Sequence, residues 1–201
     1  MPPRISVRNL SMEQLDSYYN YYKNVDGKIL IELKLREIMQ IYDSLDPSPF
    51  YQKVLDKNAE EYITEAVMDF PSSTDLKLVV YLPESEIQKD AARDLGQAVH
   101  NHFKYKADQA HREMRETLTG GRISLLIGIV FLTLTLAANL EIASHPDTVI
   151  NQTIRSSLLI IGWVAMWQPV NTFLYGWWPI RRKIKIFKKA GAIDVMVMPY
   201  R

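Results

Sequence analysis

The 201-residue chain contains no cysteine. This absence excludes disulfide bonds, thiolate metal sites and cysteine nucleophiles. The sequence also lacks the glycine-rich phosphate-binding signatures, and it lacks the H-E-x-x-H and G-x-S-x-G signatures of metalloproteases and serine hydrolases. We therefore expect a protein that is not an enzyme and that binds no cofactor.

Histidine is scarce, and the four histidines form no metal-binding pattern; they are His100, His102, His111 and His145. On a helix, His100 and His102 would point about 200° apart and could not share a metal ion. Asp108 and His111 have a suitable three-residue spacing, but no third ligand accompanies them in the sequence. We expect no metal site, solvated histidines on the helix, and His145 on the outer loop.

Charge is absent from two long stretches, residues 123–140 and 156–180. The first has 18 residues, close to the minimum for a helix that crosses a hydrocarbon core of roughly 30 Å, and the second, with 25, can cross with some tilt. The alternative is a pair of core helices in a soluble protein, but a chain of this size has little capacity to bury both. The sequence therefore predicts a transmembrane hairpin over residues 122–180.

The end of the second stretch has the pattern of a membrane–water boundary, in which aromatic residues are followed by basic ones. Six residues there are expected to contact lipid headgroups: Trp177, Trp178, Arg181, Arg182, Lys183 and Lys185. Positive charge is retained on the cytoplasmic side of membranes, whereas the connection over residues 141–155 has a single arginine. Both termini are therefore predicted to be cytoplasmic and this loop to lie outside.

The remaining charge is divided unevenly along the chain. Residues 1–122 have a net charge of −4, whereas residues 181–201, a basic juxtamembrane segment followed by a strand, have a net charge of +6. Because this basic segment directly follows a predicted span, we expect it to bind anionic lipids and not nucleic acid.

Polar residues interrupt the second predicted span near its middle, at Gln168, Asn171 and Thr172, and Pro169 between them should kink the helix. One interpretation is that these side chains hydrogen-bond to the other span or to a neighbouring copy of the chain. The other is a polar path for a solute or a proton. The first is favoured, because neither span contains the acidic, basic or histidine residue that a proton relay usually needs.

The segment before the spans has the pattern of a small cytoplasmic α+β domain over residues 28–84. Residues 28–35 and 76–82 are predicted strands, bounded by turn residues or proline. Residues 57–70 are predicted to form a helix with one apolar face. Its opposite, solvated face is expected to carry Glu60, Glu61 and Glu65.

Three further segments flank this domain. Residues 1–27 should form a tyrosine-rich helix, and residues 193–198 a strand that returns to the sheet. Residues 85–121 should form a long amphipathic helix that ends at Gly120-Gly121, a hinge or break before the first span. Its apolar stripe would pack either along its own domain or against a second helix, from another copy or from a partner.

Five segments resemble a group of bacterial inner-membrane proteins with two spans: Tyr42–Phe50, Ala59–Ile63, Gly121–Gly128, Gly162–Pro169 and Trp178–Pro179. The resemblance covers residues 28–185. It implies a two-span layout in a bacterial inner membrane. The group has no assigned activity, so the resemblance assigns no functional residue.

These observations favour a non-enzymatic membrane anchor, scaffold or accessory subunit that presents a cytoplasmic docking domain. Its expected partners are membrane lipids and either a second protein or further copies of itself, bound through the hairpin and the helix over residues 85–119. The alternative is an oligomeric channel or transport component with a polar path through the second span.

Overall fold

The computed structural model describes residues 22–25, 27–71 and 73–200, and it divides into two compact units. The first, called the α+β unit below, comprises Met1–Asp108 and Ile184–Arg201. The second, called the helical unit, comprises Gln109–Lys183. Most of the predicted N-terminal helix lies outside the described residues.

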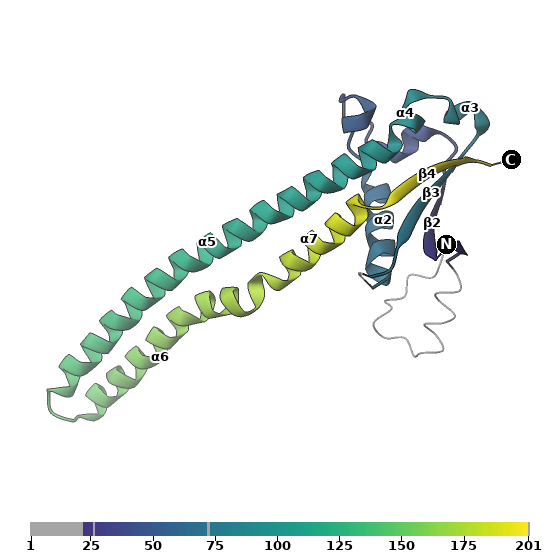
Figure 1. Cartoon of the computed structure of the whole chain (residues 1–201). Helices are drawn as coiled ribbons and strands as arrows, with labels where there is room; N and C mark the ends of the chain where they lie inside the picture. The colour runs from purple at the N-terminus through teal and green to yellow at the C-terminus, as the bar shows by residue number, and fades with distance from the viewer. Residues whose placement is uncertain (1–21, 26, 72, 201) are drawn as a thin grey trace. The chain divides into compact units, whose positions relative to one another are not determined.

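The α+β unit is built on a four-stranded sheet with the order β1-β2-β3-β4 (Figure 1). Strand β1 is antiparallel to β2, whereas β2, β3 and β4 run parallel. The strands are β1 (Asn24–Val25), β2 (Lys28–Lys34), β3 (Leu76–Leu82) and β4 (Asp194–Pro199). The two predicted strands and the return of the C-terminal strand to the sheet are confirmed. Strand β1 was not expected; a tight turn joins it to β2, and Gly27 there has a φ of 78°.

One face of this sheet forms the core of the α+β unit. Alternation in β2 directs Ile29 and Ile31 to this face, where they meet Leu78 and Val80 of β3. Side chains of α2 (Lys57–Asp69), of the first turns of α5 (Leu95–Ala143) and of the last turns of α7 (Trp178–Gly191) cover it. The predicted helix over residues 57–70 is thus confirmed as α2, capped at its start by the Asp56 carboxylate. Two 3-10 helices, η2 (Ile38–Ile41) and η3 (Phe50–Gln52), lie between β2 and α2.

The prediction of one helix over residues 85–121 is wrong about where the helix begins and where it ends. Its first ten residues form two short helices, α3 (Glu84–Ile87) and α4 (Asp90–Arg93), before α5 (Leu95–Ala143) begins. Tertiary hydrogen bonds hold these turns: the Glu86 carboxylate accepts the Ile38 N–H at 3.0 Å, and the Ala91 carbonyl accepts the Tyr42 hydroxyl at 2.8 Å. At the other end, α5 continues through Gly120-Gly121 without the expected break.

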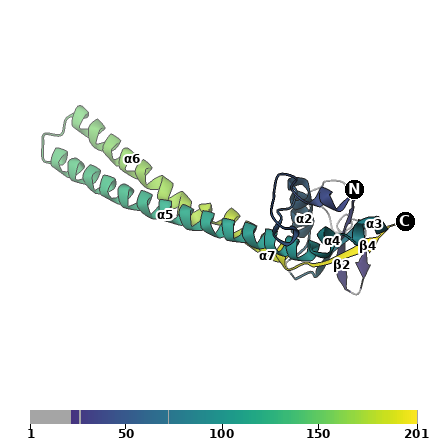
Figure 2. The same ribbon diagram turned by 90° about the horizontal axis from the view of Figure 1, so that it is seen from above.

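The helical unit contains α5 from Gln109 onward, α6 (Val149–Asn171), a π-helical turn, η4 (Thr172–Gly176), and the start of α7 (Trp178–Gly191). Helices α5 and α6 lie side by side in both views (Figures 1 and 2). Asn139 of α5 meets Arg155, whereas Gly121 meets Thr172, so the two helices run in opposite directions.

Both apolar helices extend beyond the predicted spans, and the connection between them is shorter than the expected loop of residues 141–155. The structure leaves only residues 144–148 between α5 and α6. Residues 123–143, the apolar part of α5, are helical throughout. At a rise of 1.5 Å per residue, this segment is roughly 30 Å long.

Candidate functional site

The contact between α5 and α6 depends on glycines at three levels. A Cβ added at Gly162 of α6 would lie 2.5 Å from the Thr135 Oγ1, and one added at Gly128 of α5 would lie 2.9 Å from the Met166 sulfur. At Gly121 the added atom would lie 2.8 Å from the Thr172 Cγ2. Gly120, in contrast, has open space around it. Three glycines thus let the two backbones approach closely, as small residues do where apolar helices pack in membranes.

Pro169 explains one of these close approaches. It is buried within α6 and has no N–H, so the carbonyl of Ala165 one turn earlier has no helical donor. A Cβ at Gly128 would lie 3.2 Å from that carbonyl oxygen. The missing side chain of Gly128 therefore leaves room for a carbonyl that Pro169 has freed.

The three polar residues predicted near the middle of the second span do not stay together. Thr172 faces α5 at Gly121, and its hydroxyl donates to the Gln168 carbonyl at 3.0 Å. Gln168 and Asn171 are exposed on the outer surface of α6. Within the described part of the chain, neither of their side-chain amides has a hydrogen-bond partner in α5, so the expectation of a bond to the other span does not hold for these two.

Two polar residues of α5, Thr135 and Asn139, take the place within the helix pair that Gln168 was expected to fill. Both are buried. The Asn139 amide donates to the Arg155 carbonyl at 2.9 Å, and the Thr135 hydroxyl donates to the Leu132 carbonyl. In the sequence, their only distinguishing feature is that they are polar residues within the first apolar stretch.

Trp177, Trp178 and Arg181 form one cluster on the helical unit, at the end of the second apolar stretch. The Trp177 Nε1 donates to the Phe173 carbonyl at 2.9 Å, and the Arg181 guanidinium lies 5.5 Å from the centre of the Trp177 ring. Trp178 packs edge-on against Trp177, with ring centres 6.0 Å apart, and is exposed. A cation held over an indole next to a second exposed indole suits the interfacial layer of a membrane.

The remaining predicted headgroup contacts differ in their surroundings. Arg182 and Lys185 are exposed, whereas Lys183 pairs with Glu113 at 3.4 Å. Lys189, near the end of α7, makes a hydrogen bond within the α+β unit, because its ammonium donates to the Pro71 carbonyl at 2.6 Å. Burial lowers the pKa of Lys189.

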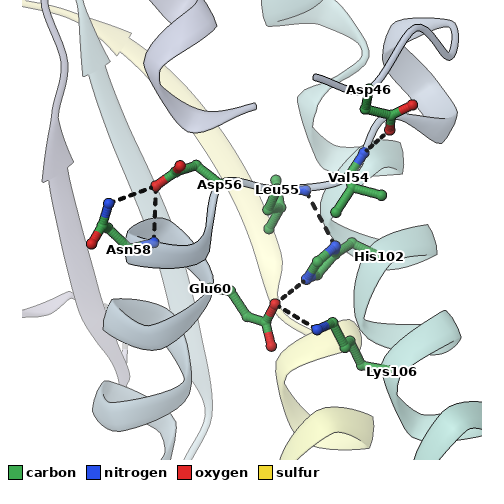
Figure 3. A network of polar contacts seen from close by, with 8 residues as sticks. All are labelled: Asp46, Val54, Leu55, Asp56, Asn58, Glu60, His102 and Lys106. Atoms are coloured by element: carbon green, nitrogen blue, oxygen red, sulfur yellow. Dashed lines mark hydrogen bonds and ion pairs between the residues drawn. The ribbon is translucent and has the colours of Figure 1, made fainter. Parts of the chain in front are cut away.

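A buried polar network lies in the α+β unit (Figure 3). The Leu55 N–H donates to the His102 Nδ1 at 3.2 Å, so the ring proton of His102 is on Nε2, which donates to Glu60 at 3.1 Å. The Lys106 ammonium reaches the same Glu60 oxygen at 3.0 Å. His102 on α5 thereby connects α2 to the loop before it.

Glu60 is charged in this network. Burial raises its pKa, but the hydrogen bonds from His102 and Lys106 together outweigh burial and hold the pKa below its ordinary value. The expectation that Glu60 and His102 are solvated is therefore wrong, because the His102 side chain is 0% exposed and that of Glu60 only 18%.

This network fits a structural role better than a catalytic one. Both His102 nitrogens are used by protein groups, and the ring is closed to solvent, so it has no position from which to take a proton from a substrate. Nearby, the Asp46 carboxylate accepts the Val54 and Ser48 N–H groups, which lower its pKa to about 2. These bonds close the loop that leads to Leu55. No cluster of three or more potential metal ligands occurs among the described residues.

The edge of β2 that faces away from β3 borders a cavity of about 560 Å³. Ile29 and Leu35 donate their N–H groups toward β3, so the N–H groups of Glu32 and Lys34 point to the opposite edge. Strand β1 covers that edge only as far as Leu30, and in the described residues these two N–H groups have no partner.

The same edge is lined on its other side by α2. The Tyr62 hydroxyl donates to the Glu32 carbonyl at 3.1 Å, and Asn58 and Ala59 form the wall next to it. Backbone donors beside a half-apolar groove are the features with which an added strand is bound.

Comparisons with known protein families, with curated proteins and with solved structures found no match to this chain. The resemblance to two-span bacterial membrane proteins therefore stays a prediction.

Proposed function

We propose that this chain is an integral membrane protein that anchors its α+β unit at the cytoplasmic face of a bacterial inner membrane and serves there as a non-enzymatic scaffold or accessory subunit. The main support is the exposure of the two long apolar helices, whose most apolar windows of 18 residues are each only 11% buried. In the core helix of a soluble protein such a window is mostly buried. Large apolar side chains such as Leu134 and Trp167 would instead face lipid.

The position of β4 supports a paired crossing. Strands β3 and β4 are neighbours in one sheet, and both apolar helices lie between them in the chain. The chain that leaves β3 must return to the same side to form β4, so it crosses a membrane an even number of times. The basic residues after the second helix favour the cytoplasm for that side.

Fractionation tests the proposal directly. We expect the full chain to stay in the membrane pellet after alkaline carbonate washing, because two spans bury too much apolar surface to be released. The cysteine-free sequence allows the topology to be read from single substitutions. Ser144→Cys should react with an impermeant maleimide in intact cells, and Lys185→Cys only after the membrane is opened. Release by carbonate, or labelling of both positions in intact cells, would contradict the proposal.

The accessory role requires a docking surface, and the β2 edge, which is open among residues 22–25, 27–71 and 73–200, supports one. It offers the Glu32 and Lys34 N–H groups beside the groove lined by α2. The occupant that fits is an extended segment of a partner protein, which would add a strand to the sheet.

Lys34→Pro tests this surface. Proline removes an N–H that points away from β3, so the β2–β3 ladder keeps its bonds, but an incoming strand loses its donor. Lys34→Ala is the matched control, because it removes the same side chain and keeps the N–H. We expect a defined protein to co-purify in mild detergent with the wild type and with Lys34→Ala, and about five-fold less of it with Lys34→Pro, as for the loss of one hydrogen bond.

Equal recovery with both variants would exclude the β2 edge as the docking surface. Recovery of no partner by the wild type, under every gentle condition, would contradict the accessory role itself. A polar path within one chain has less support, because Gln168 and Asn171 lie on the outer surface of α6 and not between α5 and α6.

A further inference from the structure

The outer surface of α6 carries a stripe that the contact with α5 does not use. Five exposed residues follow one another at steps of four, three, four and three: Ser157, Ile161, Val164, Gln168 and Asn171. These steps keep the residues on one side of a helix and match the seam of a parallel, left-handed helix pair. The residues that face α5 lie on another side of the helix, about 100° away. Gly162, Ala165 and Thr172 contact α5, and each directly follows a residue of the stripe.

Two members of the stripe bring amides into a region where nothing else can satisfy them. If Trp177 marks the membrane interface, Gln168 and Asn171 lie roughly 10 Å deeper, at 1.5 Å per residue. In the described residues their amides have no protein partner, and hydrocarbon offers neither donors nor acceptors. An amide at that depth that faces lipid is unfavourable, so a partner helix is expected on this side of α6.

We propose that the outer stripe of α6, with Gln168 and Asn171, binds the same stripe of a second copy of this chain within the bilayer. This inference rests on the proposed membrane-spanning function.

The chemistry of the stripe favours a second copy over another protein. Each side-chain amide has both donors and an acceptor, so Gln168 or Asn171 of two copies can satisfy each other across a two-fold axis. Every copy enters the membrane in the same orientation, so the two α6 helices are parallel, an arrangement that the heptad spacing allows. The positions on the stripe between the polar residues, Ile161 and Val164, are apolar and exposed.

Disulfide cross-linking tests the pairing in membranes that contain the full chain. The absence of native cysteine makes every single-cysteine variant unambiguous. Val164→Cys and Ile161→Cys lie on the stripe, where the facing Cα atoms of a parallel pair come within disulfide range, about 4.4–6.8 Å. Leu159→Cys, on the opposite side of α6 and also exposed, is the control. After oxidation, we expect a product of twice the mass from both stripe variants, and at least about five-fold less from the control.

The amides are tested by adding Gln168→Leu and Asn171→Leu to Val164→Cys. Leucine suits a surface that faces lipid, so this variant should still insert, but its cross-linked product should fall by at least about five-fold. An unchanged yield would remove the amides from the proposal. Equal yields from Val164→Cys and Leu159→Cys would indicate random collisions, and a product of a different mass would assign the stripe to another protein; either result overturns the inference.

Carbonate washing of the same membranes tests membrane insertion separately from the pairing of α6. If the chain is released, the membrane proposal fails and this inference fails with it. If the chain is retained but the stripe variants give no product, the membrane proposal stands and only the pairing of α6 is wrong.

Discussion

Replacing His102 with phenylalanine should lower the free energy of unfolding of the α+β unit by about 2–4 kcal/mol, because the buried Leu55 N–H loses its acceptor and the Glu60 carboxylate loses a donor. Phenylalanine fills a similar volume, so the change isolates the hydrogen bonds more than the packing. Amide hydrogen exchange of peptides from α2 and β3 measures the effect within this unit.

Two conservative variants divide the His102 effect between its bonds. His102→Asn places an oxygen near the position of Nδ1 and should keep the bond from Leu55, whereas His102→Gln places an N–H near Nε2 and should keep the bond to Glu60. Each should be less destabilising than phenylalanine. Lys106→Met, at a side chain 28% exposed, should cost no more than about 1 kcal/mol. A phenylalanine variant with wild-type exchange rates would show that the network is not structural.

The second large effect is expected in the helical unit. Gly162→Leu should destabilise the contact between α5 and α6 by at least about 1–3 kcal/mol, because even a Cβ there would lie 2.5 Å from the Thr135 hydroxyl oxygen. The Thr135 hydroxyl donates a hydrogen bond to the Leu132 carbonyl, so it cannot move aside without losing that hydrogen bond. All four tryptophans of the chain are in this unit, so their fluorescence during thermal unfolding in mild detergent reports on it alone.

Gly120→Leu is the matched control for Gly162→Leu. It makes the same substitution on the neighbouring helix, at a position with open space around it. Here the loss of a helical glycine should be neutral or stabilising, by about 0.5–1 kcal/mol. Similar losses at the two positions would mean that helix propensity, and not the close approach of α5 and α6, decides the stability of this unit.

Local patterns predicted the parts of the fold that local chemistry determines. The alternating residues of β2, the apolar run of β3 and the apolar face of α2 are each contained within a few neighbouring residues, and each of these elements is confirmed. The return of β4 to the sheet was also expected, although it pairs with β3 more than a hundred residues earlier.

Interactions between distant residues account for the errors. His102 and Glu60 are 42 residues apart, and each has polar neighbours in the sequence that favour a solvated face. The sequence predicts a hinge or a break at Gly120-Gly121, because two adjacent glycines are locally typical of one. The actual reason for Gly121 is the contact with Thr172, which exists only when α5 and α6 are paired. The separate environments of Thr172 and Gln168 have the same origin, since the glycine contacts determine which side of α6 faces α5.

The place of β4 at the edge of the sheet also sets the order in which the protein can mature. The ribosome completes β3 before it has made α5, α6 and α7, and β4 follows all of them. Until residue 199 has been synthesised, the nascent α+β unit has an open β3 edge and an incomplete core, since Val195 and Val197 pack against it. Final folding of this unit therefore follows the synthesis of both apolar helices, and a chain whose membrane insertion is delayed leaves that strand edge available to chaperones or to aggregation.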